Sequence, residues 1–336
     1  MNIIIPMAGR GSRLRPHTLT TPKPLIPVGG VPIVHRLVED IVNVCGQQVE
    51  NIGFVIGDFG ADTEAELLAV AKKFGATGHI FHQLNPLGTG HAVLCAEAIL
   101  HGPVVVAFAD TLFRADFNIS SEDEGILWVK RIPDPSNFGV VKMNELGEII
   151  DFVEKPKEFV SDLAMIGVYY FKDGNALHQE LNFLVDNDVI KSGEYQLPDA
   201  LRRLTEKGTR FKPGEVLEWL DCGNKEVTVA TNLRVLELDF EKGKEMVAPN
   251  AIIENSVVIP PCFIGENVRI TNSVVGPHVS IGKGGVIHQS IVSNALIQEN
   301  TQIRDLHLEN SMIGSHVVLK GSTQDLSIGD YNCWNA

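Results

Sequence analysis

The chain has 336 residues and a formal net charge of −14, which excludes a general nucleic-acid binder and a protein that docks on an anionic membrane surface. Its hydrophobic content of 44% and charged content of 21% are typical of a globular protein long enough for two domains. The charge is uneven, because residues 1–36 hold five of the 28 basic residues and none of the 42 acidic ones. This acid-free, arginine-rich end suggests a local site for an anion.

Strand-like and helix-like segments alternate over the first two-thirds of the chain. The sequence predicts strands at 3–5, 52–56, 80–81 and 103–109, and helices at 33–44, 61–74 and 89–100. This order predicts a parallel, doubly wound sheet with helices on both faces. An insertion of antiparallel or mixed strands is then expected at 126–130, 139–143, 149–153 and 166–171, with helices at 173–187, 197–207 and 224–241.

A repeat replaces the helix signals from about residue 251. Ile253, Ile270 and Ile287 are 17 residues apart, and a second column with the same spacing ends at Leu308. An apolar residue recurs every five or six positions within each unit, which predicts a parallel β-helix with three short sides per coil. A Val-rich β-sandwich is the alternative, and the shared spacing of several columns disfavours it. We expect four to five coils over 250–331, and domains at 1–245 and 246–336.

The cysteines and the apolar runs indicate the cellular compartment of the protein. The five cysteines are widely spaced and form no CxxC pair, which favours reduced thiols over a disulfide framework or a zinc site. Pro6 ends the first apolar run too early for a signal peptide, and no stretch approaches the length of a membrane span. We therefore expect a cytoplasmic protein with neither a membrane nor a nucleic acid as partner.

The loop that follows the first strand, 6–28, carries the clearest chemistry. Gly9 and Gly11 let the backbone approach a ligand closely and turn its N–H groups toward an anion. Arg13 and Lys23 add positive charge where a polyphosphate would lie. A dinucleotide site is one alternative, but Leu14 stands where its third glycine belongs. A solvated basic loop is the other.

These motifs identify a family. The run Ala8-Gly9-Arg10-Gly11-Ser12-Arg13-Leu14-Arg15-Pro16, followed by Lys23-Pro24-Leu25-Ile26-Pro27-Val28, resembles the sugar-phosphate nucleotidyltransferases, which include the glucose-1-phosphate thymidylyltransferases. Later segments match in order, among them Gly88-Thr89-Gly90-His91-Ala92, Phe152-Val153-Glu154-Lys155-Pro156 and Trp219-Leu220-Asp221-Cys222-Gly223. The resemblance covers the whole chain. It implies an α/β fold, with a doubly wound mixed sheet in a Rossmann-like nucleotidyltransferase domain and a C-terminal left-handed parallel β-helix.

Two aspartates end strand-like runs. Asp110 follows the apolar run at 103–109, so it would lie in the crevice at the carboxyl end of a parallel strand. Asp221 follows the shorter run at 216–220. Each could instead only cap a turn. As a pair they suit Mg²⁺, which takes one or two carboxylates with phosphate oxygens and water. In the family the matching aspartates hold the catalytic metal, so the resemblance implies a Mg²⁺ cofactor on Asp110 and Asp221.

The resemblance implies further roles, residue by residue. The catalytic cations would be Arg13, Lys23 and Lys155. The nucleotide would contact Ala8, Gly9, Gly11, Ser12, Arg13, Gln83, Gly88 and Thr89. The sugar phosphate would contact Gly139, Glu154, Lys155, Gly167 and Tyr169. Gln83 suits a pyrimidine edge because its amide both donates and accepts. The alternatives for these side chains are strand packing, a charged turn or a loop glutamine. His91 shows no metal-ligand spacing, so we expect it to be satisfied or solvated.

The implied reaction is nucleotidyl transfer. An oxygen of a sugar 1-phosphate attacks the α-phosphorus of a nucleoside triphosphate, and pyrophosphate leaves. We lean to dTTP with glucose 1-phosphate, and keep UTP or GTP and mannose 1-phosphate as alternatives. Departures from the family pattern at Pro6-Met7 and Ala109 put the choice of base in doubt. A non-catalytic subunit that senses nucleotide sugars and an acyltransferase β-helix are competing hypotheses. We expect the β-helix to serve assembly in a homo-oligomer.

Overall fold

The computed structural model describes residues 1–9, 11–116, 119–191 and 193–322, so Arg10, Cys333 and the predicted repeat beyond 322 lie outside the described residues. The chain divides into two compact units, Met1–Ile26 with Val31–Asn224 and Pro27–Gly30 with Lys225–Ala336. Helix α6 (Lys225–Glu241) belongs to the second unit, so the predicted boundary at 245/246 falls after this helix rather than before it. Within the described ranges no helix is long and apolar enough to cross a membrane.

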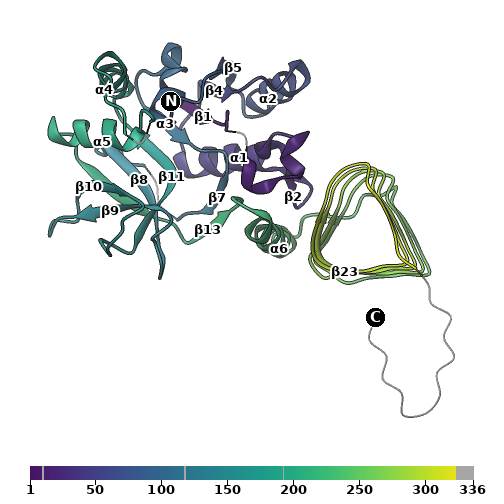
Figure 1. The fold of residues 1–336 in the computed structure, drawn as a ribbon. Coiled ribbons are helices and arrows are strands. Elements are labelled where there is room, and N and C mark those ends of the chain that lie inside the picture. The colour runs from purple at the N-terminus through teal and green to yellow at the C-terminus, as the bar shows by residue number, and fades with distance from the viewer. Residues whose placement is uncertain (10, 117–118, 192, 323–336) are drawn as a thin grey trace. The chain divides into compact units, whose positions relative to one another are not determined.

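A mixed sheet forms the centre of the first unit (Figure 1). Its strands are β1 (Asn2–Pro6), β4 (Asn51–Ile56), β5 (Thr77–His82), β6 (Val104–Ala107), β8 (Gly125–Arg131), β9 (Gly139–Met143), β10 (Ile149–Glu154), β11 (Leu163–Phe171) and β12 (Phe211–Glu215). They lie in the order β5-β4-β1-β6-β11-β8-β12-β10-β9. The first four are parallel, as the alternation predicts, and β11 joins them antiparallel to β6. The strands that we expected as an insertion therefore extend the same sheet.

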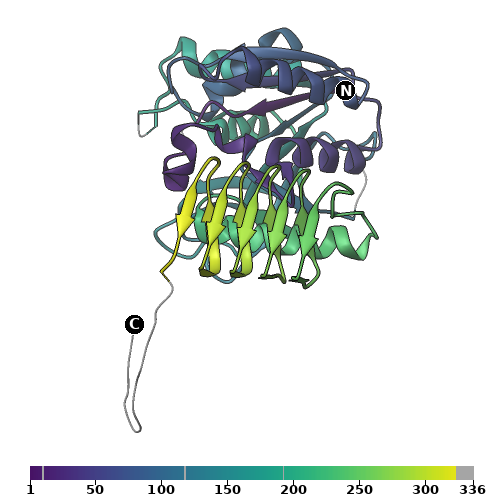
Figure 2. The same ribbon diagram turned by 90° about the vertical axis from the view of Figure 1, so that its right-hand side faces the viewer.

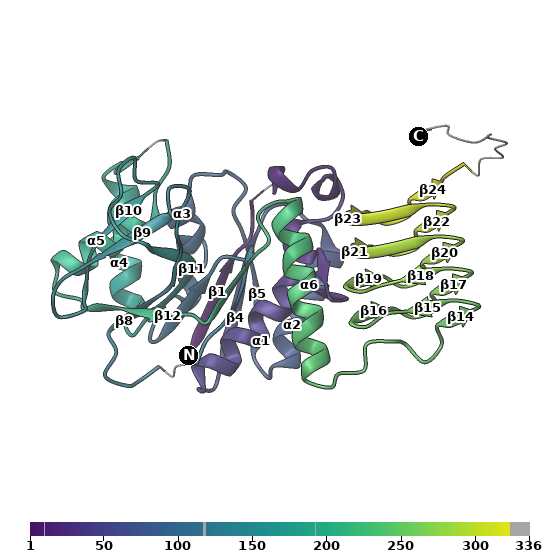
Figure 3. The same ribbon diagram turned by 90° about the horizontal axis from the view of Figure 1, so that it is seen from below.

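Helices cover both faces of this sheet (Figure 3). On one face lie α3 (Thr89–Leu94), α4 (Gly174–Asp186) and α5 (Leu197–Glu206), and on the other α1 (Ile33–Cys45) and α2 (Ala61–Lys73). Ile3, Ile4 and Ile5 are fully buried, as expected for a strand between two helical layers. The helix predicted at 89–100 is shorter than expected, because it ends at Leu94 and a separate 3-10 turn, η4 (Glu97–Ile99), follows.

The parallel strands bring the predicted functional loops to one edge of the sheet. β1, β5 and β6 lead respectively into the loop at 7–25, Gln83 and the segment that holds Asp110. Carboxyl ends of neighbouring parallel strands share an edge, which is where open α/β sheets bind ligands. The loop contains three 3-10 turns, η1 (Ser12–Leu14), η2 (His17–Leu19) and η3 (Lys23–Leu25), and β3 (Val31–Pro32) follows it before α1.

A small two-stranded sheet joins the two predicted metal ligands. β7 (Thr111–Arg114) pairs antiparallel with β13 (Glu218–Asp221), and Thr111 lies opposite Asp221. The backbone N–H of Cys222 donates to the carbonyl oxygen of Asp110 across 3.0 Å. This pairing explains how residues far apart in sequence become neighbours.

The second unit contains the parallel β-helix (Figure 2). Its coils are triangular in section when seen end-on (Figure 1), and Ile270, Ile287 and Ile303 stack in its fully buried interior. Helix α6 packs against β21 and β23, and the Asn232 side-chain oxygen accepts from the Ser280 hydroxyl at 2.7 Å. The left-handed winding stays a prediction. The second unit also contains β2 (Pro27–Val28), which lies outside the β-helix sheets. The strands of the β-helix are β14 (Ile252–Glu254), β15 (Val257–Val258), β16 (Cys262–Ile264), β17 (Arg269–Thr271), β18 (Val274–Val275), β19 (Val279–Ile281), β20 (Val286–His288), β21 (Ile291–Ile297), β22 (Gln302–Arg304), β23 (His307–Ile313) and β24 (Val318–Lys320).

The spacing of the coils changes along the β-helix. Val257 pairs with Val274 and Val274 with Ile291, as the 17-residue repeat predicts. Ile291 then pairs with His307, 16 residues on, and the same shortening appears where β20 pairs with β22. The expectation that Leu308 continues the column of Ile291 was therefore wrong. Leu308 instead follows Val292 and packs against the buried core, so the shorter coil keeps its apolar residue inside.

Candidate active site

A cavity of about 380 Å³ lies at the carboxyl edge of the parallel strands. All eight residues predicted to contact a nucleotide line it, together with Lys23 and Asp110. Asp221 and the five residues predicted for a sugar phosphate lie outside its lining. The lining residues are Pro6, Met7, Ala8, Gly9, Gly11, Ser12, Arg13, Lys23, Pro24, Gln83, Pro86, Gly88, Thr89, Ala92, Phe108, Ala109, Asp110, Glu194 and Gly223.

Gly11 fixes the shape of the basic loop. It has φ +58° and caps the 3-10 turn that carries Arg13. Its carbonyl oxygen accepts from the Thr18 hydroxyl at 2.8 Å. A β-carbon on Gly11 would lie 2.9 Å from the β-carbon of Lys23, so only glycine allows the two segments of the loop to pack this closely.

Lys23 forms an ion pair at the centre of the site. Its Nζ donates to Oδ2 of Asp110 across 2.9 Å. The lysine is buried, whereas the Asp110 side chain keeps 41% of its surface exposed. Lys23 was predicted from its charge to meet a polyphosphate, and the structure adds that Asp110 orients it. Local sequence carries no signal for this pairing.

Asp221 lies in the electric field of the same group of charges. Burial and the negative charge of Asp110 raise the pKa of the Asp221 carboxyl, while Lys23, Arg13 and a hydrogen bond from the Gly223 backbone N–H oppose this shift. Two carboxylates whose charges interact in this way form a donor set that suits a divalent cation completed by phosphate oxygens and water. Within the described ranges no group of three or more His, Cys, Asp or Glu side chains forms a metal centre, so any cation here would need those further ligands.

The glycine-rich turn before α3 is held by a distant segment. Gly88 has φ +112°, and a β-carbon there would lie 2.5 Å from the Tyr195 carbonyl oxygen. The Gly90 N–H donates to that oxygen at 2.8 Å, and the Thr89 hydroxyl oxygen accepts from the Leu197 N–H at 3.0 Å. Sequence reasoning missed the segment at 194–197, which includes Glu194 of the cavity lining. This segment joins α4 to α5 and carries no motif.

Two polar contacts hold the side-chain amide of Gln83 in place. Its Nε2 donates to the carbonyl oxygen of Gly88 at 3.0 Å and lies 3.0 Å from Nδ1 of His91. Burial lowers the pKa of His91 below its ordinary value of 6.5, which favours the neutral ring. We expected His91 to be satisfied or solvated, and its Nδ1 is satisfied by the amide of Gln83, the predicted base-reading side chain.

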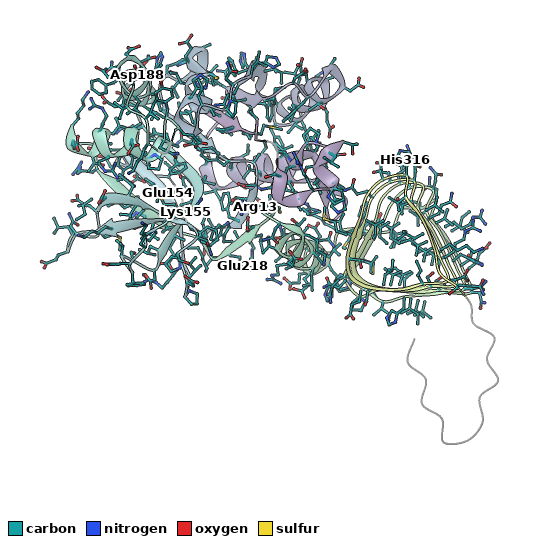
Figure 4. The ribbon with its side chains drawn as sticks, in the orientation of Figure 1. Arg13, Glu154, Lys155, Asp188, Glu218 and His316 are labelled. Atoms are coloured by element: carbon teal, nitrogen blue, oxygen red, sulfur yellow. The ribbon has the colours of Figure 1, made fainter. Side chains whose placement is uncertain are left out.

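A second group of predicted residues lies at the ends of β9 and β10. Glu154 ends β10 beside Lys155 (Figure 4), and its backbone pairs with that of Gly139. A β-carbon on Gly139 would lie 2.7 Å from Oε2 of Glu154, so the glycine leaves room for this carboxylate. Lys155 is exposed, has φ +43°, and donates its N–H to the Phe138 carbonyl oxygen at 3.1 Å.

Tyr169 and Gly167 connect the two groups. Gly167 lies in an irregular part of β11, has φ +83°, and accepts from the Phe108 N–H at 2.9 Å. The Tyr169 ring is buried and meets the Phe108 ring edge-on. Burial, with the charges of Glu154 and Asp110, raises the pKa of Tyr169. The charges of two carboxylates therefore act on Tyr169: Asp110 from the cavity and Glu154 from the group at the ends of β9 and β10.

Comparison with known proteins gives a consistent picture. Residues 2–237 match the family model described as nucleotidyl transferase. A glucose-1-phosphate thymidylyltransferase from Streptomyces griseus is 28% identical over 359 residues, covering 99% of this chain and 98% of that protein. The bifunctional protein GlmU from Methanococcus aeolicus is 32% identical over 265 residues, covering 77% of this chain. The match covers 60% of that GlmU protein, so the chain aligns with only part of its length.

Solved structures show the same fold. A UDP-glucose pyrophosphorylase complexed with UDP-glucose has a TM-score of 0.55 and 24% identity, covering 72% of this chain and 99% of that chain. The nucleoside-diphosphate-sugar pyrophosphorylase from Vibrio cholerae RC9 has a TM-score of 0.59 and 21% identity, covering 68% and 99%. At these identities the likeness concerns the fold.

Proposed function

The chain belongs to the nucleotidyl transferase family, and we propose that it joins a nucleoside triphosphate to a sugar 1-phosphate. In this reaction a phosphate oxygen of the sugar 1-phosphate forms a bond to the α-phosphorus. The bond between that phosphorus and the bridging oxygen of pyrophosphate breaks, and the products are a nucleotide sugar and pyrophosphate. The observation that carries the proposal is the cavity in which Arg13, Lys23 and Asp110 meet the glycine-rich loop.

The reaction joins two anions, so the residues would act by positioning and by neutralising charge. Arg13 and Lys23 would offset the negative charge of the triphosphate and of the departing pyrophosphate. Backbone N–H groups at Gly9 and Gly11 would face the phosphates. Lys155 would hold the attacking phosphate, and Glu154 would accept hydrogen bonds from sugar hydroxyls. The remaining predicted contacts, those of Ala8, Ser12, Gly88 and Thr89 to the nucleotide and of Gly139, Gly167 and Tyr169 to the sugar phosphate, belong to the same proposal.

Asp110 and Asp221 would hold Mg²⁺, the cofactor that we propose. The raised pKa of Asp221 supports this, because its causes, after burial, include the negative charge of Asp110. When bound, the cation would supply Lewis-acid polarisation of the α-phosphate. Lys23 would keep Asp110 oriented through the ion pair already present.

We propose dTTP with glucose 1-phosphate as the substrate pair. The support is the thymidylyltransferase from Streptomyces griseus, which aligns over nearly the whole of both chains. UTP or GTP and mannose 1-phosphate remain the other candidates. Among the described residues, Cys45, Cys95 and Cys262 are free thiols, which supports a reducing compartment such as the cytoplasm.

We also propose that the two parts of the chain have different roles. Residues 1–245 would carry out the reaction, and residues 246–336 would serve assembly into a homo-oligomer. The support is one side of the β-helix, where Val257 and Ile291 are 56% and 48% exposed and lie in the same column as Val274. Exposed aliphatic side chains in register suit contact with another protein surface.

A matrix of nucleoside triphosphates against sugar 1-phosphates, read by pyrophosphate release with Mg²⁺ present, tests the proposal. We expect turnover to be highest with dTTP and glucose 1-phosphate. Asp110→Asn should abolish it while the thermal unfolding curve stays cooperative, and the exposed Glu145→Gln should match the wild type. No pyrophosphate with any pair, together with binding of a nucleotide sugar, would favour the non-catalytic sensor instead.

A further inference from the structure

The two contacts of Gln83 determine which way its side-chain amide faces. A carbonyl oxygen can only accept, so the Gln83 atom 3.0 Å from the Gly88 carbonyl must be the nitrogen. The same nitrogen lies 3.0 Å from Nδ1 of His91. An amide nitrogen only donates, so Nδ1 must carry the lone pair and the ring proton must lie on Nε2. The orientation of Gln83 and the tautomer of His91 therefore follow from one carbonyl group.

Both hydrogens of the Gln83 amide are used in these contacts. Among the residues that the structure describes, none contributes a hydrogen bond to Oε1 of Gln83. Because Gln83 lines the cavity, this oxygen is the polar atom that it keeps for a ligand. The sequence argument assumed that the amide would both donate to and accept from the base, and the structure leaves only an acceptor.

Resting on the proposed function, we propose that His91 is a positioning residue that holds Gln83 as a hydrogen-bond acceptor for the base. The ligand class would be a nucleobase with an N–H in the middle of its pairing edge. Thymine and uracil have this donor at N3, and guanine has it at N1. Cytosine and adenine have a lone pair at that position, which would face Oε1 and repel it. His91 itself lies outside the lining of the cavity, so it would act only through Gln83.

Removing the lone pair on Nδ1 would free the amide to turn. In His91→Leu one amide hydrogen of Gln83 loses its acceptor, and its orientation then depends on Gly88 alone. His91→Asn restores an oxygen close to where Nδ1 lay, so it should keep the amide oriented. These two variants separate the acceptor at position 91 from the mere presence of a side chain there.

The experiment measures steady-state kinetics with dTTP and with its N3-methyl analogue, which lacks the N3 hydrogen, on wild type, His91→Leu and His91→Asn. The wild type should discriminate against the analogue by about a hundredfold or more in kcat/KM, because its acceptor would be left unpaired. His91→Leu should raise the KM for dTTP about tenfold, leave kcat within about twofold, and reduce the discrimination. His91→Asn should stay within about threefold of wild type on all three readouts.

The exposed His101→Leu is the matched control and should leave all three readouts unchanged. Unchanged discrimination in His91→Leu, or equal use of both nucleotides by wild type, would overturn the inference while the proposed function stands. If no sugar 1-phosphate supports turnover, the proposed function fails, and calorimetric binding of the same two nucleotides then decides the inference by the same comparison. Equal affinity of wild type for both would overturn it.

Discussion

Lys23 Nζ lies 2.9 Å from Oδ2 of Asp110, so the loop after β1 and the end of β6 are joined by an ion pair inside the candidate active site. The lysine end is buried and the aspartate end is partly open to solvent. The pair therefore presents an oriented carboxylate to a ligand while keeping a positive charge beside it. This arrangement suits a site that must bind both a cation and a polyphosphate.

Lys23→Met tests the role of this charge. The methionine would fill most of the buried space, and Asp110 would be solvated through its exposed side, so we expect less than about 1 kcal/mol of lost stability. Loss of the charge should lower kcat/KM by about 10²–10³. The exposed Lys242→Met should change neither quantity. Near-wild-type pyrophosphate release by Lys23→Met would contradict the assignment.

Gly11 and Gly46 provide a matched pair for the loop. Both have φ +58°, but a β-carbon on Gly11 would meet Lys23, whereas one on Gly46 has nothing within 4 Å. Alanine at Gly46 should therefore reduce the free energy of unfolding by about 1–2 kcal/mol because of the conformation alone, and alanine at Gly11 should reduce it further because of the contact with Lys23. Only Gly11→Ala should also lose activity, because it displaces Lys23. Equal activity in the two variants would show that the packing is unimportant.

The sequence singled out the loop glycines, Gln83 and Asp110, which all line the cavity, because strand ends and loop chemistry are local signals, while their roles stay predictions. Asp110 was found because it follows an apolar strand, and the glycines of the loop because an anion needs backbone N–H groups. The contact of His91 with Gln83 and the support of Gly88 by Tyr195 were not predictable. They depend on the packing of segments that approach only in the folded chain, and no periodicity or spacing encodes that approach.

The fold shows the same limit. Alternating strands and helices predicted the parallel half of the sheet, whereas β11 and its neighbours were assigned to an insertion because strand patterns do not specify their partners. The β-helix was predicted from its repeat. The shift at Leu308 was missed because the residue is lost at a corner: three residues, 276–278, separate Val275 from Val279, whereas two, 293–294, separate Val292 from Ala295.

Asp221 is expected to lower stability at neutral pH. Its pKa is raised in the fold, so the folded chain holds this proton more tightly than the unfolded chain does. Stability contributed by the protonated form is present at low pH and is lost as the pH rises through the raised pKa. Asp221→Asn should thus raise the melting temperature at pH 7 and have a smaller effect near pH 4. Mg²⁺ should raise the melting temperature of wild type but not of this variant, which should also be inactive.

That comparison has a clear negative outcome. A lower melting temperature for Asp221→Asn at pH 7 would contradict the raised pKa of Asp221. An equal Mg²⁺ response in both proteins would mean that the two carboxylates do not share a cation. The exposed Glu145→Gln serves as the control for a lost surface charge.

Lys155 combines a charge with a backbone conformation that favours glycine. Lys155→Ala should raise the KM for the sugar 1-phosphate by about tenfold or more while the KM for the nucleotide changes little, because only one substrate would lose its partner. Lys155→Gly relieves the positive φ but removes the same charge, so it should be at least as stable as wild type and just as impaired. Lys157→Ala, two residues away and exposed, is the control. Recovery of activity in Lys155→Gly would assign the effect to the backbone instead.

The most direct test of the central claim follows the oxygen atoms of the sugar 1-phosphate. The three oxygens of its phosphate that do not bridge to the sugar are labelled with ¹⁸O, and the products formed with an unlabelled nucleoside triphosphate and Mg²⁺ are analysed by mass spectrometry. If a phosphate oxygen attacks the α-phosphorus, all of the label should appear in the nucleotide sugar and none in pyrophosphate. Label in pyrophosphate, or release of labelled inorganic phosphate, would contradict nucleotidyl transfer by this site.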